Sequence, residues 1–241
     1  MRSPLTILDD QVCLFGLVMP LPFPRAYQVL FLALLGLLLV YPVASGVALL
    51  AGLTQLFVGL VLVAAALAAS SDGREFRITI LIALMGLLFG VVAEWLAPGT
   101  AALGASRLYG LAFLAWVTRE VLHDVLLVGR RVNAHIIYGA LCAYLLVGLM
   151  FAFAFSALHA FDPQALEGID LGGQSTAPFI EYAYFSFSSL TTLGIGDLVP
   201  TSSLARTLTW VEAVIGQIYL TVIVARLVAL YSHAALARGG D

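Results

Sequence analysis

Between two long apolar segments, the chain reads Ser188-Ser189-Leu190-Thr191-Thr192-Leu193-Gly194-Ile195-Gly196-Asp197. Polar, glycine-bearing backbone at membrane depth is tolerated only where protein buries it or where it lines a cavity. Gly194 and Gly196 are two positions apart, which suits a run with left-handed dihedrals at every second residue, a region that glycine enters at little cost. Such a run turns its carbonyl oxygens to one side, with the Thr192 hydroxyl below them. Stacked rings of oxygen can replace the hydration shell of a cation.

The composition indicates a helical membrane protein. Of the 241 residues, 62% are hydrophobic and only 10% are charged, whereas a soluble domain carries about 25% charged residues. Apolar runs of about 20 residues, the length that crosses the hydrocarbon core of a bilayer, recur along the chain. The net charge of −3 argues against a nucleic-acid partner. Cys13 and Cys142 lie far apart in dissimilar contexts and predict neither a disulfide framework nor a metal site.

The apolar pattern predicts an all-α fold with six transmembrane helices and a re-entrant stretch before the last of them. Residues 1–24 are expected to form a cytoplasmic or interfacial segment, with a signal peptide as the alternative. The spans are expected at residues 26–41, 47–69, 78–96, 108–128, 136–158 and 204–232. The links between them are expected at residues 42–46, 70–77, 97–100 and 129–135, with the outer loop at 159–203.

The arginines set the expected orientation. With the N-terminus inside, the inner links are 70–77 and 129–135, and each of these two links contains two arginines. The outer link 42–46 has no basic residue, in agreement with the positive-inside rule. Both termini are therefore expected in the cytoplasm, and the outer loop 159–203 is expected on the opposite side.

The run from Thr191 to Asp197 closely resembles the selectivity-filter signature of tetrameric potassium channels, usually Thr-Thr-Val-Gly-Tyr-Gly-Asp, with five of seven positions identical. The resemblance extends from about residue 132 to 231 and implies an outer helix, a pore helix, a filter and an inner helix. It implies passive potassium flux through a homotetramer in a lipid bilayer, with no enzymatic reaction and no cofactor beyond the permeating ion. The ion-binding positions that it implies are Thr192, Leu193, Gly194, Ile195 and Gly196, with potassium held at the first four.

Two filter positions depart from the commonest pattern of that family. Leu193 replaces valine, and its side chain is expected to face away from the ions. Ile195 replaces tyrosine; it keeps the backbone carbonyl but lacks the hydroxyl that tyrosine gives to the structure around the filter. Potassium selectivity is the preferred interpretation, and a weakly selective or non-selective cation channel that also passes sodium is the alternative.

Residues around the filter have expected supporting roles. Pro178 suits the start of a pore helix that runs to about Leu190. The filter support and outer mouth are expected to comprise Tyr184 and Phe185 as an aromatic cuff, Ser188 behind the filter, Thr191, and Asp197 at the mouth. The acids of the outer loop, which contains no Arg or Lys from 160 to 200, are expected to attract cations; they are Asp162, Glu167, Asp170, Glu181 and Asp197.

Two inner-helix residues are gating candidates with open alternatives. Gly216 matches the position of the family's hinge glycine, and it serves either as a hinge or as a helix-packing glycine. Glu212 lies one turn earlier, and an intramembrane carboxylate is a functional candidate. It either lines the cavity and attracts cations or faces the pore helix and forms hydrogen bonds behind the filter.

The expected organisation has four parts. Residues 1–24 are the N-terminal segment, 25–131 a four-span domain without voltage-sensor arginines, 132–232 the pore domain and 233–241 a short cytoplasmic tail. The resemblance to small bacterial channels implies a bacterial inner membrane. A secondary transporter with a broken helix is the alternative from another class, but transporters of that kind usually repeat the broken segment in two halves, and this chain has one.

Overall fold

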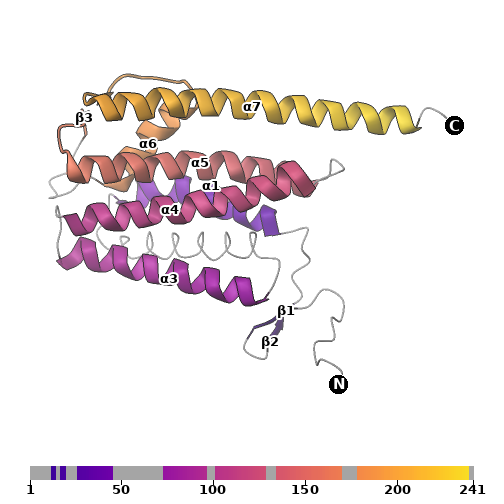
Figure 1. Cartoon of the computed structure of the whole chain (residues 1–241), viewed down its shortest axis with the longest axis horizontal. Helices are drawn as coiled ribbons and strands as arrows, with labels where there is room; N and C mark the ends of the chain where they lie inside the picture. Colours follow the sequence, from indigo (N-terminus) through magenta and orange to yellow (C-terminus); the bar gives the residue numbers. More distant parts are fainter. Residues whose placement is uncertain are drawn as a thin grey trace.

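The computed structural model describes residues 12–14, 17–19, 26–45, 73–96, 101–128, 134–169 and 178–238. Helices dominate these residues, and α7 extends past the others toward the C-terminus (Figure 1). In chain order the elements are β1 Val12–Leu14, β2 Leu17–Met19, α1 Ala26–Ser45, α3 Gly73–Leu96, α4 Ala101–His123, the π-helix η3 Asp124–Val128, α5 Ala134–Phe161, β3 Leu166–Glu167, α6 Phe179–Leu190, β4 Val199–Pro200 and α7 Ser203–Arg238.

Five of the six expected apolar segments coincide with helices, namely α1, α3, α4 with η3, α5 and α7. The expected segment 47–69 lies outside the described residues. Two of the described helices contain a stretch that is long and apolar enough to cross a membrane: Ile136–Phe161 in α5 and Ser203–Arg226 in α7. Shorter apolar stretches occur at Tyr27–Val40 and Thr79–Gly90.

Several predicted boundaries were wrong, always because a helix runs further than its apolar core. Helix α1 continues through Pro42 to Ser45, so the expected link 42–46 is largely helical; membrane helices tolerate proline where neighbouring groups satisfy the freed carbonyl. Helix α3 begins at Gly73, inside the expected polar loop, because Arg and Glu have good intrinsic helix propensity. Helix α7 continues to Arg238, so most of the expected tail is helical.

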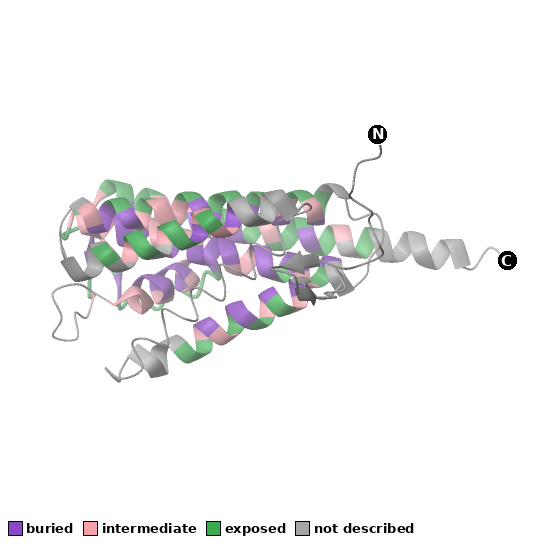
Figure 2. Ribbon diagram, turned by 90° about the horizontal axis from the view of Figure 1, so that it is seen from below, coloured by how far each residue is buried: buried purple, intermediate pink, exposed green. Residues whose placement is uncertain are grey.

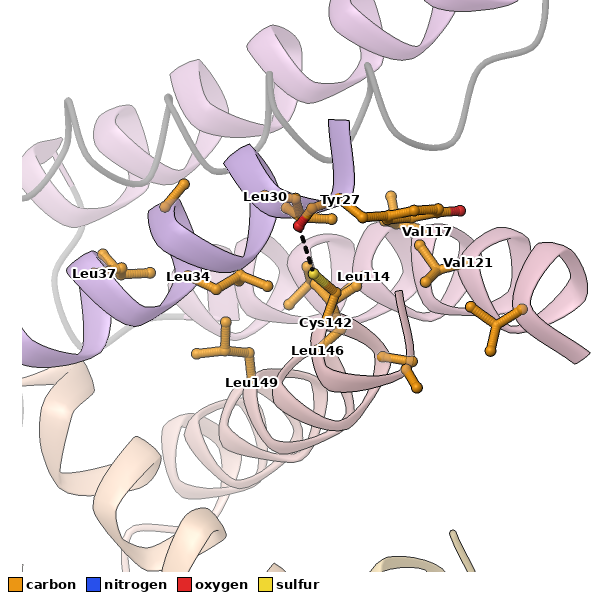
Figure 3. Packing of buried hydrophobic residues seen from close by; sticks show 14 of the residues in the cluster. Tyr27, Leu30, Leu34, Leu37, Leu114, Val117, Val121, Cys142, Leu146 and Leu149 are labelled. Carbon is orange, nitrogen blue, oxygen red and sulfur yellow. Dashed lines mark hydrogen bonds between the residues drawn. The ribbon is translucent and has the colours of Figure 1, made fainter. Parts of the chain in front are cut away.

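The main core lies where α1, α4 and α5 meet (Figure 3). Leu30 and Leu34 of α1 pack with Val117 of α4 and with Cys142 and Leu146 of α5, and all five side chains are fully buried. The Cys142 thiol donates a hydrogen bond of 3.3 Å to the carbonyl of Tyr27 across this core. Buried residues lie between the helices, and exposed residues cover their outward faces (Figure 2).

The π-helix at the end of α4 was not predicted, and two distant elements are bound to it. The Tyr27 hydroxyl at the start of α1 donates to Asp124 Oδ2 at 2.8 Å. The Arg226 guanidinium of α7 donates to the carbonyl oxygen of Val125. Single π-turns within α-helices often occur at functional positions. This one joins the first and the last described helix of the chain.

Four short strands were also not predicted. Strands β1 and β2 form an antiparallel hairpin in which Val12 pairs with Met19. Strands β3 and β4 form a second antiparallel pair, with Leu166 opposite Pro200 and Glu167 opposite Val199. The second pair ties the loop after α5 to the chain that leaves the Thr191–Asp197 run.

Candidate functional site

The short helix α6 positions the candidate site. It begins after Pro178, whose φ of −58° suits a helix start, and its N-terminus has no side-chain cap hydrogen bond. The buried side chains of α6 pack against α5 and form a second core around Phe155 and Phe185. The helix ends at Leu190, immediately before the Thr191–Asp197 run.

The backbone dihedral angles of this run alternate in handedness, as the spacing of the glycines predicts. Positive φ angles occur at Thr192 (58°), Gly194 (56°) and Gly196 (86°). Among the described residues, Thr192 is the only non-glycine residue with a positive φ. A β-branched residue is an outlier in that region, and such residues cluster at functional sites. Alternating handedness at every second residue turns successive carbonyls toward one side.

The last turn of α6 holds the inner end of the run. The Ser188 carbonyl accepts hydrogen bonds from the backbone N–H groups of Leu193 at 2.8 Å and Gly194 at 3.2 Å. The N–H of Thr192 donates to the Ser189 carbonyl at 2.9 Å. The Thr191 hydroxyl donates to the Phe187 carbonyl at 2.7 Å. Any movement of α6 is therefore passed directly to the run.

The outer end of the run is held by side chains. The Tyr184 hydroxyl donates to Asp197 Oδ2 at 2.8 Å, and the backbone N–H of Leu198 donates to Asp197 Oδ1 at 3.0 Å. The hydrogen bond to Asp197 raises the pKa of the Tyr184 phenol above its ordinary value. Of the two residues expected in an aromatic cuff, Tyr184 reaches the run. Phe185 points to α5, where its ring packs edge-on against Phe155 at 4.8 Å between centroids.

The loop after α5 packs onto this outer end. Gly168 has a φ of 92° and lies so close to the carbonyl of Asp197 that a Cβ there would clash with it. Two hydrogen bonds of Thr201 anchor the same loop: its N–H donates to the Ala165 carbonyl at 3.0 Å, and its hydroxyl donates to the Gln164 carbonyl. Glu167 is exposed in β3 beside the mouth of the run, whereas Asp170 lies outside the described residues.

Glu212 and Gly216 lie one turn apart on α7, and both face α6. Glu212 is fully buried, and its Oε1 lies 2.5 Å from the Ser186 hydroxyl. Gly216 is also buried, and a Cβ added there would come within 3.0 Å of the Leu190 carbonyl oxygen. Ser186 and Leu190 are four residues apart on α6, as Glu212 and Gly216 are on α7, so each pair lies on one face of its helix. Of the two positions considered for Glu212, the structure has the one against α6.

Sequence reasoning missed two polar residues of the site. Ser186 is fully buried and also lies 2.6 Å from the Gly148 carbonyl of α5. Gln217 is exposed on α7, with its amide nitrogen 3.5 Å from the Thr192 hydroxyl. Both are uncharged polar residues within apolar helices, and attention to that signal would have found them.

The run itself is open on one side in the single chain. All seven residues from Thr191 to Asp197 are exposed, including the apolar side chains of Leu193 and Ile195. The adjoining face of α7 is also exposed and carries Trp210, Val214 and Ile218, which are 59%, 46% and 58% exposed. Among the described residues no cluster of His, Cys, Asp and Glu could hold a metal ion.

Residues 139–233 match a protein-family model whose description is "Ion channel". The match covers less than half of the chain and includes α6, the Thr191–Asp197 run and most of α5 and α7. Searches of curated proteins and of solved structures gave no significant match.

Proposed function

We propose that this chain, a helical membrane protein whose residues 139–233 match an ion channel family model, forms a passive and potassium-selective cation channel. The observation that carries the proposal is the alternation of positive φ at Thr192, Gly194 and Gly196 in an exposed run. A backbone of this kind presents a column of carbonyl oxygens that can replace the hydration shell of a cation.

The proposed ion ligands are the carbonyls of Thr192, Leu193, Gly194 and Ile195, with Gly196 completing the backbone. The carbonyls at the C-terminal end of α6 add a partial negative charge near the inner end of the run, which favours a cation there. Ile195 supplies its carbonyl as tyrosine would. Exposed carboxylates at Asp197 and Glu167 raise the local cation concentration at the mouth.

The open side of the run supports assembly into a homotetramer. One strand of carbonyls cannot enclose an ion, so several copies must contribute to one pathway. The exposed apolar face of α7 beside the run offers a surface for those copies. In this arrangement the chain lies in a bilayer, with a bacterial inner membrane as the proposed location, both termini in the cytoplasm and the N-terminal helices outside the pore domain.

Weak selectivity is the second candidate, and Ile195 favours it. The Ile195 side chain is exposed and has no hydroxyl, so it donates no hydrogen bond to the structure around the run. In the single chain, two hydrogen bonds to the Asp197 carboxylate support the outer end of the run; the Tyr184 hydroxyl and the backbone N–H of Leu198 donate them. A filter with less lateral support would hold its carbonyls less firmly and discriminate less between potassium and sodium.

The test is the reversal potential of the purified protein in a planar bilayer, with potassium on one side and sodium on the other. We expect reversal near the potassium equilibrium value. Reversal near zero with clear current would replace the proposal by a non-selective channel, and coupled flux that saturates with substrate would indicate a transporter.

The matched control is Gly194→Ala. Nothing lies within 4 Å of a Cβ added at Gly194, but its φ of 56° disfavours alanine. The substitution therefore perturbs the carbonyl column without a clash. Current that persists unchanged in this variant would come from a contaminant or from another pathway.

A further inference from the structure

Three helices of the pore region meet at one hydroxyl group. The Ser186 Oγ of α6 lies 2.6 Å from the carbonyl oxygen of Gly148 in α5 and 2.5 Å from Oε1 of Glu212 in α7. Ser186 and Glu212 are both fully buried. Ser186 lies two residues before Ser188, whose carbonyl accepts the hydrogen bonds that hold the run.

A count of hydrogen atoms decides the protonation state of Glu212. A serine hydroxyl has one hydrogen to donate, and a backbone carbonyl has none. If Glu212 were ionised, Ser186 would face two acceptors with a single hydrogen, and one of the two close oxygen pairs would have no hydrogen between its atoms. If Glu212 is protonated, its Oε1–H donates to Ser186, and Ser186 donates to Gly148.

The second carboxyl oxygen leads to the same conclusion. Glu212 Oε2 is buried and has no hydrogen-bond partner, and no ion pair of Glu212 occurs within the described part of the chain. An ionised carboxylate there would carry its charge without a counter-ion. An unpartnered carbonyl oxygen of a neutral acid costs far less than an unpartnered charge.

We propose that Glu212 is held as the neutral acid and is a positioning residue for the filter. Its proton completes a series of hydrogen bonds from Glu212 through Ser186 to the Gly148 carbonyl. These hydrogen bonds fix α6 between α5 and α7. The inference about the proton rests on the positions and partners of these oxygen atoms and does not depend on the proposed function. Its consequence for conduction rests on the proposed function, because α6 transmits its position to the run through the Ser188 carbonyl.

The first test is infrared difference spectroscopy of the purified wild type and Glu212→Gln at neutral pH. We expect a carbonyl stretch of a protonated carboxylic acid that is present in the wild type and missing in the variant. The control is Glu120→Gln, because Glu120 forms an ion pair with Arg119 at 2.5 Å and should lose only carboxylate bands. A difference spectrum for Glu212→Gln that contains only carboxylate bands would overturn the proposal. This readout does not depend on current, so it separates the proposal from the proposed function.

The second test compares currents. Glutamine keeps the shape and offers an N–H donor to Ser186, so we expect Glu212→Gln to keep the wild-type unitary current and reversal potential. Glu212→Ala removes the donor and leaves a cavity, and we expect loss of the selective current. A reduced unitary current in Glu212→Gln would contradict the proposal, because it would show that a negative charge at Glu212 serves conduction. Wild-type behaviour of Glu212→Ala would also contradict it.

Discussion

Gly216 provides a direct test of how α7 contacts α6. Replacing it by alanine places a Cβ against the carbonyl oxygen of Leu190, at a separation that non-bonded atoms do not tolerate. A backbone carbonyl cannot rotate away as a side chain can, so α6 or α7 must shift. Overpacking of this kind costs about 1–3 kcal/mol. Alanine also favours the helix over glycine by about 1 kcal/mol, which offsets part of that cost.

A second glycine in the chain allows the two contributions to be separated. Gly90 of α3 is also within a helix, but nothing lies within 4 Å of a Cβ added there. Gly90→Ala should therefore show the helix-propensity gain alone. The difference in unfolding free energy between Gly216→Ala and Gly90→Ala isolates the clash, and we expect Gly216→Ala to be the less stable by about 1–3 kcal/mol.

The assay is unfolding in mixed micelles, followed by circular dichroism, together with single-channel recording of each variant. Equal stability of the two variants would refute the reasoning from the Leu190 contact. Equal stability combined with altered open probability in Gly216→Ala would support the alternative in which Gly216 is a hinge. A loss of stability accompanied by altered selectivity would indicate that the displaced α6 disturbs the filter.

Three further predictions concern single side chains. Tyr219→Phe removes the 2.6 Å hydrogen bond from the Tyr219 hydroxyl to the Ala140 carbonyl, and we expect the unfolding free energy to fall by about 0.5–1.5 kcal/mol without a change in reversal potential. Tyr184→Phe removes the donor to Asp197, so sustained current should decay faster under constant voltage; an unchanged decay would show that this bond does not support the filter. Ile195→Tyr should leave the reversal potential unchanged, since the proposed ligand is the backbone carbonyl, and a shift toward the potassium value would show that the native filter is weakly selective.

Local backbone chemistry was the most predictable part of the site. The spacing of Gly194 and Gly196 indicated alternating handedness, and the positive φ angles at 192, 194 and 196 confirm it. The helical segments were predictable for a related reason, because long apolar runs between polar links have few other structures in a membrane. The exact ends of the helices were not predictable, since a helix such as α7 continues into polar sequence once it has formed.

The rotation of each helix about its own axis could not be predicted from the sequence. A membrane helix that is apolar on all sides gives no periodic signal for the face that meets its neighbours, which is why the direction of Glu212 stayed open. The π-helix at Asp124–Val128 was also unpredictable from local sequence, because its contacts come from Tyr27 and Arg226, about a hundred positions away. The roles of the filter residues themselves remain predictions.

The core shared by α1, α4 and α5 has a consequence for any attempt to reduce this protein to a minimal channel. Cys142 and Leu146 belong to the expected pore domain, but Leu30, Leu34 and Val117 bury them from outside it. A version that begins at residue 132 would expose the Cys142 and Leu146 side chains to lipid. It would also remove the Val125 carbonyl that Arg226 now contacts. The N-terminal helices therefore form part of the packing of residues 132–232, and we expect that removing them would change the structure of the remaining helices.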